Sequence, residues 1–263
     1  GQICLCGSRI FVEKSIAAKF VEALVEVTKT VISTCFNFYI EFLEFKTITH
    51  TKMYCSSIGD PKTSKTGSLI SLDHRSKVES YVELALKEGG KIVLGGHRPK
   101  DLKPPFDKGA FYVPTIITGL PFDSHIYMKI YIYAYIYICI YVFFLIKILK
   151  NNIQWFGCQF HTLLLRRCAT EEIFGPVVTV HEFQTENEVI DMCNSVKYGL
   201  AGSVWTNHLK RGHRVAQAIE SGMIWVNCWM KRDLRVPFGG VKESGVGREG
   251  GQYSMDFWTH QKN

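Results

Sequence analysis

The stretch from Leu200 to Asn227 reads LAGSVWTNHLKRGHRVAQAIESGMIWVN, and its pattern predicts the fold class. Residues 200–206 and 223–227 are apolar and typical of strands. The residues between them predict a helix that Asn207 can cap and Gly222 ends. Strands that alternate with helices predict a parallel sheet that is covered on both faces.

The same alternation continues towards the amino end. Ser15 and Ser71 can each cap a helix in which apolar residues recur three or four positions apart. These apolar residues are Ile16, Phe20, Leu24, Val27 and Val31 in the first helix, and Val78, Tyr81, Val82, Ala85 and Leu86 in the second. Glycines 89–90 stop the second helix, and residues 91–94 follow as a short strand. A capping-box pattern at residues 185–188 predicts a further helix.

Composition narrows the class of protein. The chain has 263 residues, 46% of them hydrophobic, which suffices for one large domain or two small ones. The nine cysteines form no C-x-x-C pair and no secretory signal is visible, so we expect a reduced, cytoplasmic compartment and no metal site. The net charge of +7 does not predict a nucleic-acid surface, because no basic-aromatic module is visible. Four of those charges lie in one stretch without acidic residues, at Lys129, Lys147, Lys150 and Arg166.

Two stretches, at about residues 32–57 and 125–166, break the alternation. Residues 130–146 carry no charge, and Tyr alternates with Ile there, which is a signal for a strand and for aggregation. Their number also lies at the lower edge for a transmembrane helix. Both stretches are rich in Ile, Tyr, Phe, Lys and Asn, as translated A/T-rich intron sequence would be. Three interpretations remain: retained introns or a gene-model error, a real insertion, or a membrane anchor at 130–146.

A thiol lies near the amino end, in the string Gly1-Gln-Ile-Cys-Leu-Cys-Gly-Ser-Arg9. Most cysteines are buried and inert, whereas a nucleophilic cysteine needs a thiolate and partial exposure. Gly1 and Gly7 suit a close approach of the backbone, so the N–H group of Cys4 can face a developing oxyanion. Cys6 completes no metal site, and we interpret it as a small packing residue.

A second motif, Glu171-Glu-Ile-Phe-Gly-Pro-Val177, combines carboxylates with an aromatic residue. A carboxylate such as that of Glu172 suits two hydroxyl donors, and an aromatic face such as that of Phe174 orients a flat ring. The plain alternative is a helix end followed by a turn, with Gly-Pro as the breaker.

A third motif lies near the carboxyl end, in Pro237-Phe-Gly-Gly-Val-Lys-Glu-Ser-Gly-Val-Gly-Arg-Glu249. Residues 245–250 satisfy G-x-G-x-x-G, the dinucleotide fingerprint. No strand is predicted before them, and the chain ends 13 residues later, too soon for the acid that binds the ribose. We therefore predict that these glycines are tight-turn residues.

Together the three motifs resemble those of the NAD(P)-dependent aldehyde dehydrogenases. The resemblance implies that Cys4 attacks the carbon of a small-molecule aldehyde and forms a thiohemiacetal and then a thioester. It implies that Glu172 binds the nicotinamide ribose of an NAD cofactor and that Phe174 packs near the nicotinamide ring. The residues it places at the aldehyde pocket are Ile3, Leu5, Trp229 and Phe238.

The resemblance also implies a domain organisation. The expected fold is α/β, the three-layer parallel-sheet catalytic domain of the aldehyde dehydrogenases. It spans residues 1–250, interrupted by the two atypical stretches, and residues 251–263 are the remnant of a C-terminal oligomerisation arm. The family places its Rossmann-type domain, its oxyanion asparagine and its general-base glutamate before Gly1. We therefore expect this polypeptide alone to be inactive and poorly folded, and the parent enzyme to be a homo-oligomer.

Arg232 is the residue that indicates the substrate. A guanidinium at this position offers a fork to a substrate carboxylate, and Arg235 is the alternative donor. Residues 229–235 resemble the branch of the family that oxidises muconate semialdehydes, which carry a carboxylate distant from the aldehyde. The alternative for Arg232 is a solvated loop arginine. For the whole protein two alternatives stay open: a non-catalytic fragment or mis-spliced product of an aldehyde dehydrogenase gene, and a membrane-anchored enzyme that uses residues 130–146.

Overall fold

The computed structural model describes residues 1–32, 58–60, 62, 64, 66–100, 102–122, 167–260 and 262. Almost all of the two atypical stretches, including residues 130–146, lies outside these ranges. The chain divides into a first unit, residues 1–120 and 171–186, and a second unit, residues 121–170 and 187–263. None of the helices in the described ranges is long and apolar enough to cross a lipid bilayer.

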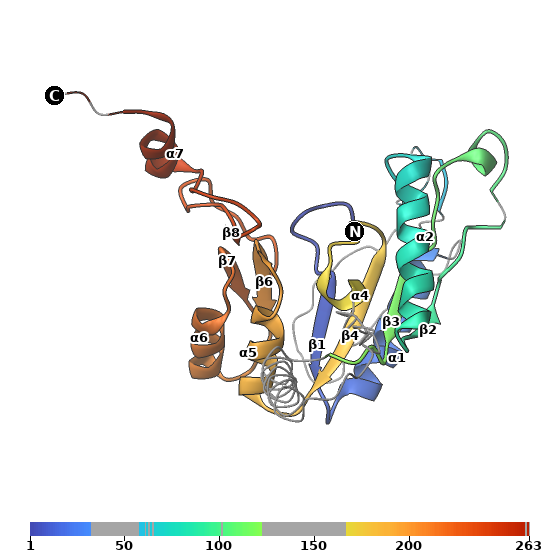
Figure 1. Ribbon diagram of the computed structural model, residues 1–263, viewed down its shortest axis with the longest axis horizontal. Helices are drawn as coiled ribbons and strands as arrows, with labels where there is room; N and C mark the ends of the chain where they lie inside the picture. The colour runs from blue at the N-terminus through green and yellow to red at the C-terminus, as the bar shows by residue number, and fades with distance from the viewer. Residues whose placement is uncertain are drawn as a thin grey trace, which may run out of the picture. The chain divides into compact units, whose positions relative to one another are not determined.

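The first unit is built on a four-stranded sheet with the strand order β1-β4-β3-β2 (Figure 1). The strands are β1 (Arg9–Glu13), β2 (Lys91–Leu94), β3 (Thr115–Thr118) and β4 (Val177–Phe183). β4 pairs in parallel with β1 and β3, whereas β2 pairs antiparallel with β3. The prediction of a purely parallel sheet is therefore wrong at β2. Among the described residues between β2 and β3, the only helix is the short η1 (Phe106–Lys108), and an antiparallel pair needs no crossover helix.

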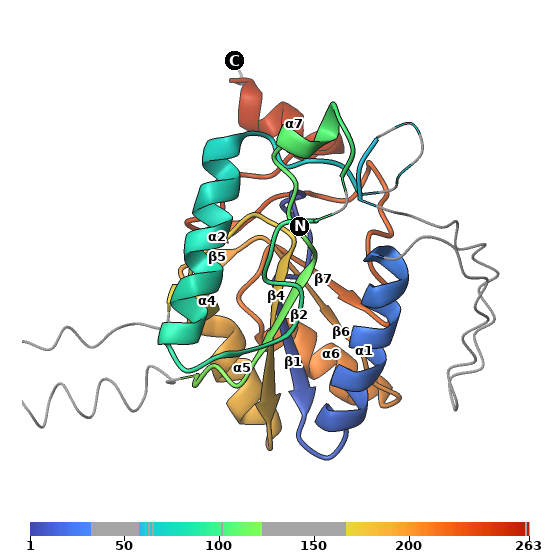
Figure 2. The same cartoon turned by 90° about the vertical axis from the view of Figure 1, so that its right-hand side faces the viewer.

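Two helices cover opposite faces of this sheet, α1 (Ala17–Ile32) and α2 (Leu72–Lys87) (Figure 2). The cluster beneath α1 consists of Ile10, Val12, Ala17, Val21, Leu24, Val25, Leu94, Ile116, Val178 and Val180. The core-facing stripe of α1 matches the prediction at Leu24 but not at Ile16 and Phe20, which are 53% and 36% exposed. Ser15 does not cap the helix through its side chain, because its hydroxyl donates to the Glu13 carboxylate at 3.0 Å.

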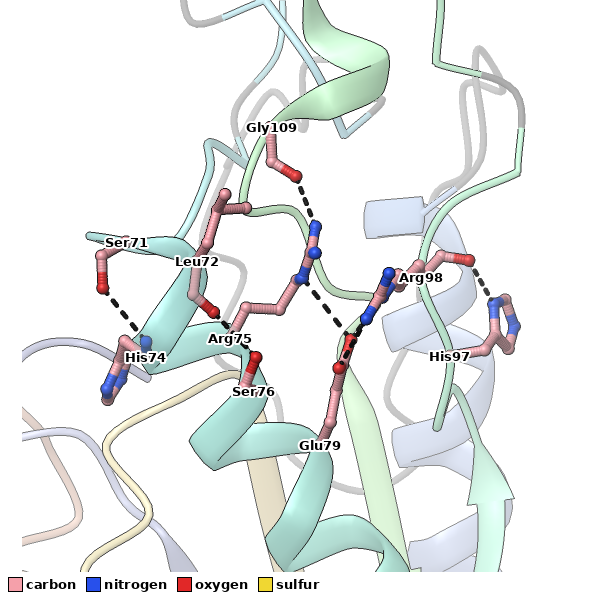
Figure 3. Close-up of polar contacts among 9 residues, drawn as sticks. All are labelled: Ser71, Leu72, His74, Arg75, Ser76, Glu79, His97, Arg98 and Gly109. Carbon is pink, nitrogen blue, oxygen red and sulfur yellow. Dashed lines mark hydrogen bonds and ion pairs between the residues drawn. The ribbon is translucent and has the colours of Figure 1, made fainter.

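The second helix, α2, follows its prediction closely. Ser71 caps it, since its hydroxyl accepts a hydrogen bond from the His74 backbone N–H at 3.0 Å (Figure 3). The buried residues of α2 are Val78, Tyr81, Val82 and Ala85, whereas Leu86 is 54% exposed. Gly89 follows the end of the helix with a φ of 90°, a left-handed conformation that suits glycine.

A shared carboxylate ties α2 to the loop that follows β2. Glu79 accepts two hydrogen bonds from Arg98, at 2.6 and 2.8 Å, and Arg75 lies 3.5 Å from the same carboxylate (Figure 3). Arg75 also donates to the carbonyl of Gly109 at 2.7 Å. The hydrogen bonds from Arg98 are the largest cause of a lowered pKa of Glu79. These contacts hold Arg98 and Gly109 against one side of α2.

The second unit contains two separate strand pairs (Figure 1). β6 (Ala201–Val204) and β7 (Met223–Val226) pair in parallel, as predicted, and α6 (Leu209–Ala218) connects them. β5 (Tyr198–Gly199) and β8 (Val241–Lys242) pair antiparallel. The remaining helices are α4 (Arg167–Thr170), α5 (Glu186–Asn194) and α7 (Gly251–Trp258). The N-cap residue of α6 is His208 and not the predicted Asn207, and the His208 side chain makes no capping hydrogen bond.

His181 on β4 predicts a pH dependence of stability. It is 3% exposed, stacks on Phe11 and contacts the Thr179 hydroxyl at 2.9 Å, and burial lowers its pKa from 6.5 to about 4. Between pH 6.5 and 4 the unfolded chain binds a proton that the folded chain excludes. We therefore expect the free energy of unfolding to keep the full contribution of neutral His181 above pH 6.5. It should lose about 3 kcal/mol as the pH falls from 6.5 to 4. Unfolding midpoints between pH 4 and 8 check this, and a His181→Gln variant with the same acid dependence as the wild type would contradict it.

Candidate active site

Cys4 lies at the corner of a tight turn that immediately precedes β1. The turn closes through a hydrogen bond of 2.9 Å from the Cys6 N–H to the Ile3 carbonyl. Cys4 is exposed and is a free thiol. Its backbone N–H donates to no residue in the described part of the chain, which leaves it available to an oxyanion. Of its neighbours, Ile3 is 55% exposed whereas Leu5 is 6% exposed and packs inward.

The motif at residues 171–176 precedes β4 in the same way as the Cys4 turn precedes β1. Because β1 and β4 pair in parallel, their amino ends lie at one edge of the sheet. The two segments touch there, since a Cβ atom on Gly1 would overlap the carbonyl group of Gly175. Thr179 strengthens the connection by donating its N–H to the Ser8 carbonyl at 3.0 Å. The first unit therefore brings the predicted nucleophile loop and the predicted cofactor motif together.

The side chains of this motif have different environments. Glu172 is exposed, and no side chain in the described ranges pairs with its carboxylate. Phe174 is half-buried and has a φ of 57°, in the left-handed region that non-glycine residues rarely adopt. Glu171 is held from α2, since the Tyr81 hydroxyl donates to its carboxylate at 2.6 Å. Glu172 is thus the carboxylate that remains open to hydroxyl donors.

In the second unit, the motif near the carboxyl end is folded back on itself. Phe238 and Glu249 exchange two backbone hydrogen bonds, at 2.7 and 2.8 Å. Arg248 donates to the carbonyls of Gly240 and Gly247 at 2.8 and 2.7 Å. Lys242 donates to two carbonyls at the end of α5 and pairs with Glu220 at 2.6 Å. The charged residues of the motif therefore hold its backbone in place.

Residues 245–250 do not form a dinucleotide-binding turn. Gly247 and Gly250 have φ values of 71° and 103°, as expected of tight-turn residues. The preceding strand β8 has two residues and pairs antiparallel with β5, so it is not the first strand of a parallel strand–helix–strand unit. The prediction that these glycines serve turns is confirmed.

The two candidate arginines of the second unit differ in what they contact. Arg232 lies over the Phe238 ring, with its guanidinium carbon 4.2 Å from the ring centroid, and no carboxylate in the described ranges pairs with it. Arg235 is paired with Asp233, to which its Nε donates at 2.9 Å. Trp225 supports the loop by donating to the Lys231 carbonyl at 2.8 Å. Trp229, the remaining predicted pocket residue, is 48% exposed. Of the two guanidinium groups, that of Arg235 therefore has a carboxylate partner, and that of Arg232 has none in the described ranges.

Comparison with known proteins agrees with this geometry. The sequence profile described as the aldehyde dehydrogenase family matches residues 39–129 and 165–263. The chain belongs to the aldehyde dehydrogenase family. The matched ranges include Glu172, Phe174, Arg232 and Phe238, and they leave residues 1–38 and 130–164 unmatched.

Individual relatives extend the similarity to the whole chain, including Cys4. The chain is 38% identical over 263 residues to 2-aminomuconic semialdehyde dehydrogenase of Homo sapiens, and 34% identical over 265 to 2-hydroxymuconic semialdehyde dehydrogenase of a Pseudomonas species. It is covered completely in both comparisons but spans only 41% and 40% of the relatives.

Solved structures of the family share the fold. A betaine aldehyde dehydrogenase from Staphylococcus aureus, in complex with NAD+, matches 98% of this chain and 38% of its own, with a TM-score of 0.68 and 30% identity. An aldehyde dehydrogenase variant from Bacillus cereus matches 99% of this chain and 38% of its own, with a TM-score of 0.69 and 29% identity.

Sequence reasoning missed the residues of α2 that support the cofactor motif. His74, Lys77 and Tyr81 all contact residues 171–174. Their spacing of three and four residues places them on one face of the helix, and it was visible in the sequence. Nothing local in the sequence showed which segment, about 90 residues further on, they would contact.

Proposed function

We propose that the enzyme containing this chain oxidises an aldehyde to a carboxylic acid with NAD+, through a covalent bond to Cys4. The observation that carries this proposal is the contact between Gly1, three residues before Cys4, and Gly175 of the cofactor motif, at the amino ends of β1 and β4. The two segments carry an exposed thiol at Cys4, together with a Cys4 backbone N–H and a Glu172 carboxylate that have no partner among the described residues. The family membership of the chain supports the same chemistry.

The described residues fit part of an NAD+ site. Glu172 has an open carboxylate that can accept hydrogen bonds from two ribose hydroxyls. Phe174 presents an aromatic ring from a backbone that is fixed by neighbouring contacts. When bound, NAD+ supplies an acceptor for the hydride of the substrate carbon.

The chain's own contribution to the reaction centres on Cys4. Its thiolate adds to the carbonyl carbon and forms a C–S bond, while the carbonyl oxygen gains the negative charge that the Cys4 N–H can stabilise. The addition converts an aldehyde, which is a poor hydride donor, into an oxyanionic thiohemiacetal. After oxidation the substrate is a thioester, and water cleaves its C–S bond to release the acid and the thiol.

We further propose that the substrate carries a carboxylate distant from its aldehyde, as a muconic semialdehyde does. Arg232 supports this, because its guanidinium stacks on Phe238 and has no carboxylate partner in the described ranges. An arginine in this state offers a planar, bidentate fork to a carboxylate. The similarity to the two muconic semialdehyde dehydrogenases supports the same substrate class.

Thiol alkylation combined with a turnover assay tests the proposed function. In the full-length enzyme, iodoacetamide should label Cys4 at least about tenfold faster than Cys6, Cys193 or Cys228, as read by peptide mass spectrometry. The same preparation should form NADH from NAD+ and a carboxylate-bearing semialdehyde. Uniform labelling of the cysteines together with absence of NADH would support the non-catalytic alternative.

A further inference from the structure

One face of α2 contacts the cofactor motif at four points. Tyr81 donates to the Glu171 carboxylate at 2.6 Å, Lys77 donates to the Glu172 carbonyl at 3.4 Å, and the Phe174 carbonyl lies 2.7 Å from His74 Nε2. Val78 is the fourth point, because a Cβ atom on Gly175 would come within 2.5 Å of its Cγ2 atom. Residues 171–175 thus run antiparallel to the helix along a single face.

Among these contacts, the one from His74 acts on the most constrained residue of the motif. Phe174 has a left-handed backbone, with a φ of 57°, which costs free energy unless surrounding contacts hold it. A carbonyl oxygen only accepts hydrogen bonds, so Nε2 of His74 must carry the proton, and both the neutral and the charged imidazole can donate it. His74 itself is fixed, because its backbone N–H bonds to the Ser71 cap.

On another side of α2, contacts of Arg75 and Glu79 hold the helix in place. Figure 3 shows Arg75 and Glu79 extending towards Arg98 and Gly109, whereas the ring of His74 points away from them. The helix is therefore anchored on one side to the loop after β2 and on another side to the cofactor motif. A displacement of the motif would break contacts to a helix that cannot follow it.

We propose that His74 is a positioning residue for the cofactor site. It holds the Phe174 carbonyl, and through it the neighbouring Glu172 carboxylate, in the conformation that receives the nicotinamide ribose. This inference rests on the proposed function. It adds that affinity for the nucleotide depends on a helix residue that does not touch the nucleotide.

The test uses the full-length enzyme with His74→Ala, His74→Gln and, as a matched control, His97→Ala. His97 is an exposed histidine whose ring bonds to the Arg98 carbonyl, away from the motif (Figure 3). Calorimetric titration of NAD+ into the free enzyme should show a Kd raised about tenfold by His74→Ala. Gln also donates an N–H group at the end of a side chain of similar reach, so His74→Gln should recover the Kd to within about threefold.

A second readout separates positioning from general destabilisation. Hydrogen exchange of the free enzyme should speed up over residues 173–177 in His74→Ala and stay unchanged over β1 and β3. The kcat at saturating NAD+ should change less than about twofold, because His74 does not touch the reacting atoms. If the His74→Ala variant does not fold, the Tyr81→Phe variant is used in its place. This variant removes only the hydrogen bond from the Tyr81 hydroxyl to Glu171, and it should raise the Kd for NAD+ about threefold.

The outcomes distinguish this inference from the function on which it rests. An unchanged Kd in His74→Ala, or a Kd in His74→Gln as high as in His74→Ala, would overturn the positioning role. A wild-type enzyme that binds no NAD+ would instead overturn the proposed function. In that case faster exchange over residues 173–177 would still show that His74 holds the motif, and unchanged exchange would remove that contact as well.

Discussion

Replacing Cys4 by serine in the full-length enzyme is expected to lower the kcat for NADH formation by about 10³-fold or more. The two side chains have nearly the same size, and the Cys4 turn is closed by backbone atoms of Ile3 and Cys6, so the fold should not change. A serine hydroxyl is a weak nucleophile without a paired base, whereas a thiol near neutral pH supplies a fraction of thiolate. The loss should therefore be chemical and should leave the Kd for NAD+ unchanged.

Cys6 provides the matched control for this variant. It lies two residues away in the same turn, is also a free thiol and is only partly exposed. Cys6→Ser should keep the kcat within about twofold of the wild type, because we assign it to packing. Undiminished NADH formation in Cys4→Ser would remove the covalent mechanism, and a large loss in Cys6→Ser alone would transfer the role of nucleophile to Cys6.

Arg232→Ala is expected to change substrate choice more than general activity. The kcat/KM for a semialdehyde that carries a carboxylate should fall about 30-fold to 100-fold, which corresponds to the loss of a charge-assisted bidentate contact. The kcat/KM for a neutral aldehyde of the same length should fall less than about threefold. Steady-state kinetics with the two substrates in parallel measures this difference directly.

Arg235 is the control, because it has the same charge and lies three residues away. Its guanidinium is already paired with Asp233, so Arg235→Ala should affect both substrates equally and weakly. Arg232→Lys keeps the charge without the fork and should recover only part of the preference. Equal losses for both substrates in Arg232→Ala would remove the carboxylate clamp, and a selective loss in Arg235→Ala would assign the clamp to Arg235.

Local signals predicted α2 well and α1 less well. In α2 the capping serine, the apolar spacing and the terminal glycines all indicate the same helix, and the buried residues agree. In α1 apolar residues lie on more than one side, so their spacing permits two stripes. The sheet selects the stripe at Ala17, Val21 and Leu24, because these residues contact Ile116 and Val180 in the observed packing.

Three strands of the first unit, β1, β3 and β4, were not predicted for a related reason. β3 is four residues long and three of them are buried, so it shows no alternation of polar and apolar residues. β1 and β4, of five and seven residues, follow the two motifs. Their role as the frame of the site depends on pairing with each other, and pairing between distant segments leaves no periodic mark in either one.

The sequence by itself determined which chemical groups this protein carries and where each motif lies. The sequence shows the thiol of Cys4, the carboxylate of Glu172, the aromatic ring of Phe174 and the guanidinium of Arg232. Each belongs to a contiguous motif that can be identified from neighbouring residues alone. Only the folded structure showed that Gly1 lies against Gly175. It also showed that Asp233 forms its ion pair with Arg235 and not with Arg232. It also decided that His74 holds Phe174, 100 residues away. The contacts of Gly1 with Gly175 and of His74 with Phe174 depend on the pairing of β1 with β4 and on the packing of the first unit, whereas the pair of Asp233 with Arg235 depends on the local conformation of its own loop.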